Sequence, residues 1–129
     1  MKAGVGLGRQ LIVELFGCDR DLLDSIDKLR RALIEAAKAS RSTVIGHVFH
    51  KFSPQGVSGV IVIAESHLAI HTWPEYGYAA VDIFTCGKHT DPWGALAVIK
   101  EALKPKRIAV MEVRRGLMVK ELVTEPSAI

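Results

Sequence analysis

Long hydrophobic runs are missing from this chain of 129 residues. No segment approaches the roughly 18 consecutive apolar residues that a membrane-spanning helix requires, and the first residues lack the apolar core of a secretion signal. Cysteine is also scarce, because only Cys18 and Cys86 are present. Two cysteines so far apart do not make the disulfide framework of a small secreted protein, so we predict two reduced thiols. We therefore expect a cytoplasmic protein with no membrane partner.

A strong excess of charge is missing as well. The 17 Lys and Arg residues are opposed by 14 Asp and Glu residues, which leaves a net charge of +3. The basic residues form only short clusters, at 30–31, 104–107 and 114–115, which solvated helix ends and strand edges explain. We therefore expect no nucleic acid partner.

The sequence has no compact set of metal ligands. It contains no Cys-x-x-Cys pair, although His67 and His71 would share one face of a strand. A metal-binding protein that uses these two residues together with His47, His50 and Cys86 is the alternative from another functional class, and metal analysis would test it. We predict no metal site.

The chain does contain enough apolar sequence for one core, since 49% of its residues are hydrophobic. We expect a single domain over residues 1–129. Alternating and β-branched runs predict strands, and apolar residues that recur at three and four predict helices. The expected strands are 10–16, 43–52, 57–64, 68–72, 78–85 and 107–113, and the expected helices are 20–40 and 92–103. This order predicts an α+β two-layer sandwich, a mainly antiparallel sheet with helices packed on one face.

The segment 65–76 brings a hydroxyl nucleophile, two imidazoles, two carboxylates and an indole together within twelve residues, directly after the apolar run 59–64. Within it, Ser66 is a weak nucleophile unless a base or backbone strain activates it, and its nearest electrophile is the carbonyl of Glu65. Attack there would convert the amide to an ester, and β-elimination would cut the chain and leave dehydroalanine, which hydrolyses to a pyruvoyl group. An arbitrary Glu-Ser pair more often ends a strand by capping backbone groups, so the dipeptide alone does not decide between the two interpretations.

The whole block from Glu65 to Tyr76 resembles the self-cleavage site of the small prokaryotic S-adenosylmethionine decarboxylases, which are pyruvoyl-dependent enzymes of polyamine biosynthesis. The resemblance implies that Ser66 becomes a covalent pyruvoyl group, with no external cofactor, and that Glu65 ends the released amino-terminal chain. The products would be a β chain of residues 1–65 and an α chain of residues 66–129. The ketone would form a Schiff base with the substrate amine and withdraw electrons from the carbon that loses carbon dioxide.

The same resemblance implies roles for three further residues. His71 would handle the proton during cleavage, Ser58 would hydrogen-bond the cleavage intermediate, and Cys86 would return a proton to the substrate carbon. Without the resemblance, each residue type also fits an ordinary structural position. On an ideal strand Ser66 and His71 would point to opposite faces, because their separation is odd. A bulge, or a break in the strand at the cleavage point, is therefore expected.

The substrate implied by the resemblance is S-adenosylmethionine. Glu75 would accept hydrogen bonds from its ribose hydroxyls, while Phe52 and Trp73 would stack on the adenine and the sulfonium. Trp73 also fits a packed aromatic residue at a strand end. Relatives of this length imply a homodimer of processed protomers whose active sites draw on both subunits. Two alternatives stay open: a pyruvoyl-dependent arginine decarboxylase of the same superfamily, and a regulatory paralogue that no longer cleaves itself.

Overall fold

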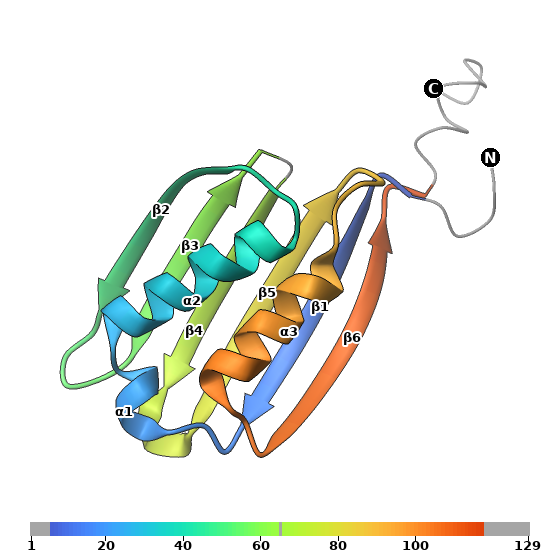
Figure 1. The fold of residues 1–129 in the computed structure, drawn as a ribbon. Coiled ribbons are helices and arrows are strands. Elements are labelled where there is room, and N and C mark those ends of the chain that lie inside the picture. Colours follow the sequence, from blue (N-terminus) through green and yellow to red (C-terminus); the bar gives the residue numbers. More distant parts are fainter. Residues whose placement is uncertain (1–5, 65, 118–129) are drawn as a thin grey trace, which may run out of the picture.

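The computed structural model describes residues 6–64 and 66–117, which form one antiparallel sheet with helices on one side (Figure 1). The six strands lie in the order β2-β3-β4-β5-β1-β6. The elements along the chain are β1 (Gly8–Phe16), α1 (Arg20–Leu23), α2 (Ile26–Ala39), β2 (Val44–Lys51), β3 (Val57–Ile63), β4 (Ser66–Trp73), the 3-10 turn η1 (Pro74–Tyr76), β5 (Tyr78–Cys86), α3 (Pro92–Leu103) and β6 (Arg107–Arg115). The predicted α+β two-layer sandwich is confirmed.

The helix predicted over 20–40 is two helices. The first turn, α1, is capped by Asp19, whose carboxylate accepts a hydrogen bond from the Leu22 N–H at 3.0 Å. Asp24 then leaves the helical path, and the Ser25 hydroxyl accepts a hydrogen bond from the Lys28 N–H to begin α2. Both residue types favour helix ends over helix interiors, because their side chains satisfy free backbone N–H groups. The prediction of one continuous helix was therefore wrong at residues 24–25.

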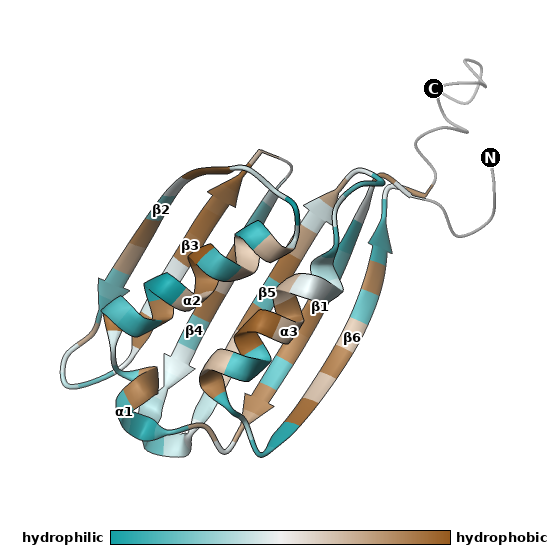
Figure 2. Cartoon of the chain, viewed as in Figure 1, coloured by the Kyte–Doolittle hydropathy of each residue, from teal (hydrophilic) through white to brown (hydrophobic). Residues whose placement is uncertain are grey.

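The core lies between the sheet and the two long helices. Figure 1 shows α2 and α3 side by side on the same face of the sheet, and the apolar strands beneath them stand out in Figure 2. Alternate strand residues face the helices and are fully buried. The largest of these side chains are Leu11, Val13, Leu15, Ile61, Leu68, Ile70 and Ile83. Burying them against α2 and α3 fixes which strand residues point away from the helices.

The other face of the sheet has no helix over it in the described part of the chain. Its exposed side chains include Ile12, Val48, Val62 and Met111, of which Val48 is 69% and Met111 62% exposed. We call this surface the open face. No helix of residues 6–64 and 66–117 is long and apolar enough to cross a membrane.

Candidate active site

The open face of β3 and β4 brings two predicted site residues into contact. Ser58 and His71 are directly paired across these antiparallel strands. The Ser58 Oγ lies 2.8 Å from the His71 Nδ1, so one hydrogen bond joins the two side chains. Because this bond occupies Nδ1, the Nε2 of His71 is the nitrogen available to other groups.

Ser66 is the first residue of β4, where it pairs with Ile63 of β3. A cavity of about 680 Å³ is lined by Ser58, Ser66 and His71 together with His50, His67 and apolar side chains of β2, β3 and β4. The pairing of β4 with β3 runs from Ser66 to His71 without a register shift, so the expected bulge is absent between these residues. By alternation Ser66 has the parity of the buried Leu68 and Ile70 and not that of His71, yet as the first residue of the strand it lines the same cavity as His71. Its Oγ lies 3.4 Å from the Nδ1 of His67.

A second cavity, of about 300 Å³, adjoins the first. Phe52, Trp73 and Glu75, the three residues predicted to bind substrate, all line it. Ser58 and His71 line both cavities and so form a shared wall. The turn between β2 and β3 supplies Phe52, and the end of β4 with η1 supplies Trp73 and Glu75. Two segments that are separate in the sequence therefore meet around one hollow beside the Ser58–His71 pair.

Cys86 is the last residue of β5 and lines neither cavity. It is partly buried and lies two residues beyond Phe84, which pairs with His67 near the start of β4. Because alternate residues share a face, Cys86 and Phe84 point to the open face. The structure therefore places Cys86 on the open face, two residues beyond the partner of His67. Glu65 lies outside the described residues.

The wall of the smaller cavity is supported by Tyr78 and Glu14, which the sequence analysis left without a role. The Tyr78 hydroxyl donates to both carboxylate oxygens of Glu14, at 2.7 and 2.6 Å. Burial, reinforced by the hydrogen bond to Glu14, raises the pKa of Tyr78 to about 12. The Tyr78 ring also packs on that of Trp73, with 5.3 Å between centroids. Only the pairing of β1 with β5 brings Glu14 to Tyr78, and nothing local in the sequence indicates it.

His50 is a further residue that the sequence analysis did not assign to this site. It pairs with Ser58 across β2 and β3, and it lines the larger cavity. The short connection between the expected strands 43–52 and 57–64 was the available signal for this position, because a turn fixes which residues of its two strands stand opposite each other. No group of three or more His, Cys, Asp or Glu side chains in the described chain could hold a metal ion.

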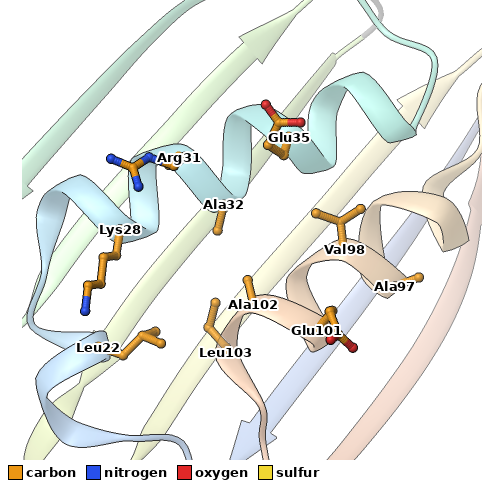
Figure 3. Close-up of a pocket in the computed structure, with 10 residues that line it drawn as sticks. All are labelled: Leu22, Lys28, Arg31, Ala32, Glu35, Ala97, Val98, Glu101, Ala102 and Leu103. Carbon is orange, nitrogen blue, oxygen red and sulfur yellow. The ribbon is translucent and has the colours of Figure 1, made fainter.

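A third cavity lies on the helix side of the molecule. Figure 3 shows it as a groove between α2 and α3, with Ala32, Val98 and Ala102 along its floor and Arg31, Glu35 and Glu101 among its borders. Its volume is about 630 Å³. None of the predicted site residues lines it, so the sheet separates this groove from the two cavities of the open face.

Comparison with known proteins identifies similar chains. A family model described as S-adenosylmethionine decarboxylase matches residues 9–116. The S-adenosylmethionine decarboxylase proenzyme of Thermotoga maritima is 54% identical over 110 residues, 85% of this chain and 85% of that protein. The proenzyme of the same name from Caldicellulosiruptor saccharolyticus is 54% identical over 111 residues, 86% of this chain and 90% of that protein. The crystal structure of the adenosylmethionine decarboxylase from Aquifex aeolicus has a TM-score of 0.81 at 39% identity, covering 86% of this chain and 92% of that chain.

Proposed function

Because this chain belongs to the S-adenosylmethionine decarboxylase family, we propose that the two adjoining cavities of the open face are its active site. The protein is a proenzyme that processes itself and then decarboxylates S-adenosylmethionine, in the polyamine pathway. The observation that supports the location is the shared wall, because Ser58 and His71 line both the cavity of Ser66 and that of Glu75. The relatives are named for S-adenosylmethionine, which decides against arginine as the substrate.

The self-processing step begins at Ser66 in this proposal. Its Oγ attacks the carbonyl carbon of Glu65, the peptide C–N bond breaks, and the acyl group of Glu65 moves from nitrogen to oxygen as an ester. A base then removes the Cα proton of residue 66, and the Cβ–O bond breaks to release Glu65 as a carboxylate. The dehydroalanine that remains takes up water and loses ammonia, which leaves a ketone at the front of residues 66–129.

His71 is the proposed base and Ser58 its partner. The hydrogen bond of 2.8 Å between them holds the imidazole by its Nδ1 and leaves the Nε2 available to a further group. An imidazole can both accept and return a proton during one reaction. The Ser58 hydroxyl would also donate a hydrogen bond to the oxygen that becomes negative when Ser66 attacks.

The residues around Ser66 fit a pyruvoyl group. Ser66 faces a cavity that adjoins the proposed substrate cavity, so a ketone at this position would meet the amine of a substrate bound there. The group would supply the electron sink for the carbon–carbon bond that breaks during decarboxylation. Cys86 is the proposed acid that gives a proton to the substrate carbon from its Sγ. Cys18 and Cys86 are both free thiols, which suits the reducing cytoplasm, where we place the enzyme.

The smaller cavity suits the nucleoside part of the substrate. The Glu75 carboxylate can accept two hydrogen bonds from neighbouring ribose hydroxyls. Trp73 is 40% and Phe52 47% exposed, so each ring has a free surface for stacking on adenine or for contact with the sulfonium. These contacts would hold the amino acid part of the substrate toward the shared wall and Ser66.

The assembled enzyme in this proposal is a homodimer of processed protomers joined through their open faces. The apolar side chains that this face exposes would be buried against a second copy. Both cavities also open on this face, so a second copy would close them from above and could contribute side chains to the site.

Intact-mass spectrometry tests the processing step directly. We expect the purified wild-type protein to yield two fragments, residues 1–65 and 66–129, the second with a ketone in place of its α-amine. The Ser66→Ala variant is the matched control and should remain a single chain with no decarboxylase activity, because it lacks the attacking oxygen. A wild-type protein that stays intact, or an S66A variant that is cut at the same bond, would contradict the proposal.

A further inference from the structure

The junction between α1 and α2 contacts the turn that forms one wall of the smaller cavity. Asp24 lies at this junction, and its Oδ1 accepts a hydrogen bond from the backbone N–H of Gly56 at 2.8 Å. Its Oδ2 lies 2.7 Å from the Nζ of Lys51. Gly56 lines the cavity, and Lys51 directly precedes Phe52, which lines it too. One carboxylate therefore holds both ends of the turn between β2 and β3.

Lys51 and Asp24 make a second contact that orients the pair. The Lys51 Nζ also donates to the main-chain oxygen of Asp24 at 3.1 Å, so one ammonium group binds two oxygens of the same residue. The hydrogen bond from Lys51, followed by that from the Gly56 N–H, holds the pKa of the Asp24 carboxyl below its ordinary value. Asp24 is therefore charged at neutral pH, and its contacts with the turn are charge-assisted.

Neighbouring residues of α1 reach the same wall. The Thr72 Oγ1 donates to the main-chain oxygen of Leu23 at 2.8 Å and accepts from the Val57 N–H at 2.9 Å. Arg20 donates to the side-chain oxygen of Gln55 at 2.9 Å. Thr72 and Gln55 both line the smaller cavity. The α1 segment thus supports the cavity wall from the side away from the open face.

The turn has a main-chain hydrogen bond across it, from the Phe52 N–H to the Gly56 carbonyl oxygen at 2.8 Å, while the Gly56 N–H is bonded outside the turn, to Asp24. Gly56 has a φ of +104°, a conformation that favours glycine, and a Cβ placed there would lie 3.2 Å from the Thr72 main-chain oxygen. Glycine gives the backbone the freedom to leave this conformation as well as to adopt it. The hydrogen bond to Asp24 is the contact that holds the Gly56 N–H in place.

We propose that Asp24 is a positioning residue for substrate binding, which fixes the turn 52–56 so that Phe52 and Gly56 keep the smaller cavity in its binding shape. The inference depends on the proposed function of that cavity. Among the described residues, Asp24 makes no hydrogen bond or ion pair with Ser66, Ser58 or His71. Its loss would weaken contacts that the substrate makes equally before and during the reaction. Such a change raises KM and leaves kcat nearly unchanged.

The experiment compares Asp24→Ala and Asp24→Asn with Asp27→Ala in fully processed enzyme. Asp27 is a matched control, because its exposed carboxylate pairs only with Arg30 of the same helix in the described structure, at 2.9 Å. We expect D24A to raise the KM for S-adenosylmethionine about fivefold to tenfold with kcat within about twofold, since a displaced wall weakens substrate binding. D24N keeps an oxygen for the Gly56 N–H and should raise KM only about twofold. D27A should match the wild type.

A KM for D24A equal to that of D27A would overturn the proposal, whatever the melting temperature, because a purely structural role would lower stability alone. If D24A does not fold, the KM of D24N is compared with the KM of Asp27→Asn, and equal values would again overturn the proposal. Glu75→Gln separates this inference from the function of the cavity. An unchanged KM in E75Q would remove the cavity assignment, whereas a raised KM in E75Q with an unchanged KM in D24A would remove only the role of Asp24.

Discussion

The hydrogen bond between Ser58 and His71 is the reason for proposing His71 as the base for self-processing. It holds one imidazole nitrogen and leaves the other available to a further group. His67 is a structural rival, because its Nδ1 lies 3.4 Å from the Ser66 Oγ. This short distance in the uncut chain does not by itself make His67 the base, because proton transfer also requires the two groups to be aligned.

Replacing each histidine in turn distinguishes these two residues. We expect His71→Asn to slow self-cleavage by about a hundredfold or more, which is the ordinary contribution of a positioned base. His67→Asn should slow it much less, and His47→Asn, at a position that lines neither cavity, should have no effect. The fraction of uncut chain against time, followed by denaturing electrophoresis, gives the rates. A slow H67N beside a normal H71N would reverse the assignment.

The phenol of Tyr78 gives a second prediction, which concerns pH. Burial and the hydrogen bond to Glu14 favour the neutral phenol and raise the pKa of Tyr78 to about 12. Any stability that this pair contributes is therefore fully present below the ordinary tyrosine pKa of about 10, and it is lost as the pH rises through the folded value. The chain has only two tyrosines, so Tyr76→Phe leaves Tyr78 as its single phenol.

We expect the phenolate absorbance of the Y76F variant to rise with a midpoint near pH 12. Adding Glu14→Gln removes the negative charge beside the phenol and should move the midpoint down. The unfolded Y76F protein in denaturant provides the reference titration. A folded midpoint equal to that reference, or one that E14Q does not change, would mean that Glu14 and Tyr78 are not paired as described.

At the scale of elements, local patterns predicted which strands form better than they predicted where the elements end. The expected strands 43–52 and 57–64 correspond to the paired strands β2 and β3, whose short connection places Phe52 and Ser58 near each other. The expected strand at 68–72 begins at Ser66, because its pairing with β3 extends to the first residue after the gap in the described chain. The extension of β4 to Ser66 depends on pairing with the partner strand and not on the strand propensity of the added residues.

The helix predicted over 20–40 failed for a different reason. Apolar residues continue at helical spacing through Leu22, Leu23 and Ile26, so periodicity gives no sign of the interruption. The capping residues Asp24 and Ser25 were the available signal, and their contacts show why the break matters, since Asp24 reaches Gly56 across the fold. Long-range contacts of this kind, like that of Glu14 with Tyr78, follow from the sheet order and cannot be predicted from neighbouring residues.

At the scale of the whole molecule, the open face and the groove of Figure 3 are rival surfaces for a second copy. The open face exposes the apolar side chains of Ile12, Val48, Val62 and Met111 and carries both cavities, whereas the groove lies behind the sheet. Met111 on β6 is 62% exposed on the open face and lines neither of its cavities. Ala97 on α3 is exposed at the groove. A charge introduced at each position therefore tests one surface without altering the described active-site residues.

We expect Met111→Glu to convert the proposed dimer to a monomer, because two copies related by a twofold axis would each bury the new charge in the interface. Ala97→Glu should remain dimeric, since glutamate suits an exposed helix position. Light scattering coupled to size-exclusion chromatography would report twice the mass of one processed protomer for the wild type and A97E, and a single protomer for M111E. If A97E dissociates while M111E stays dimeric, the interface lies over the helices. If the wild type is itself a monomer, each protomer must complete its own active site, and the open face stays in contact with solvent.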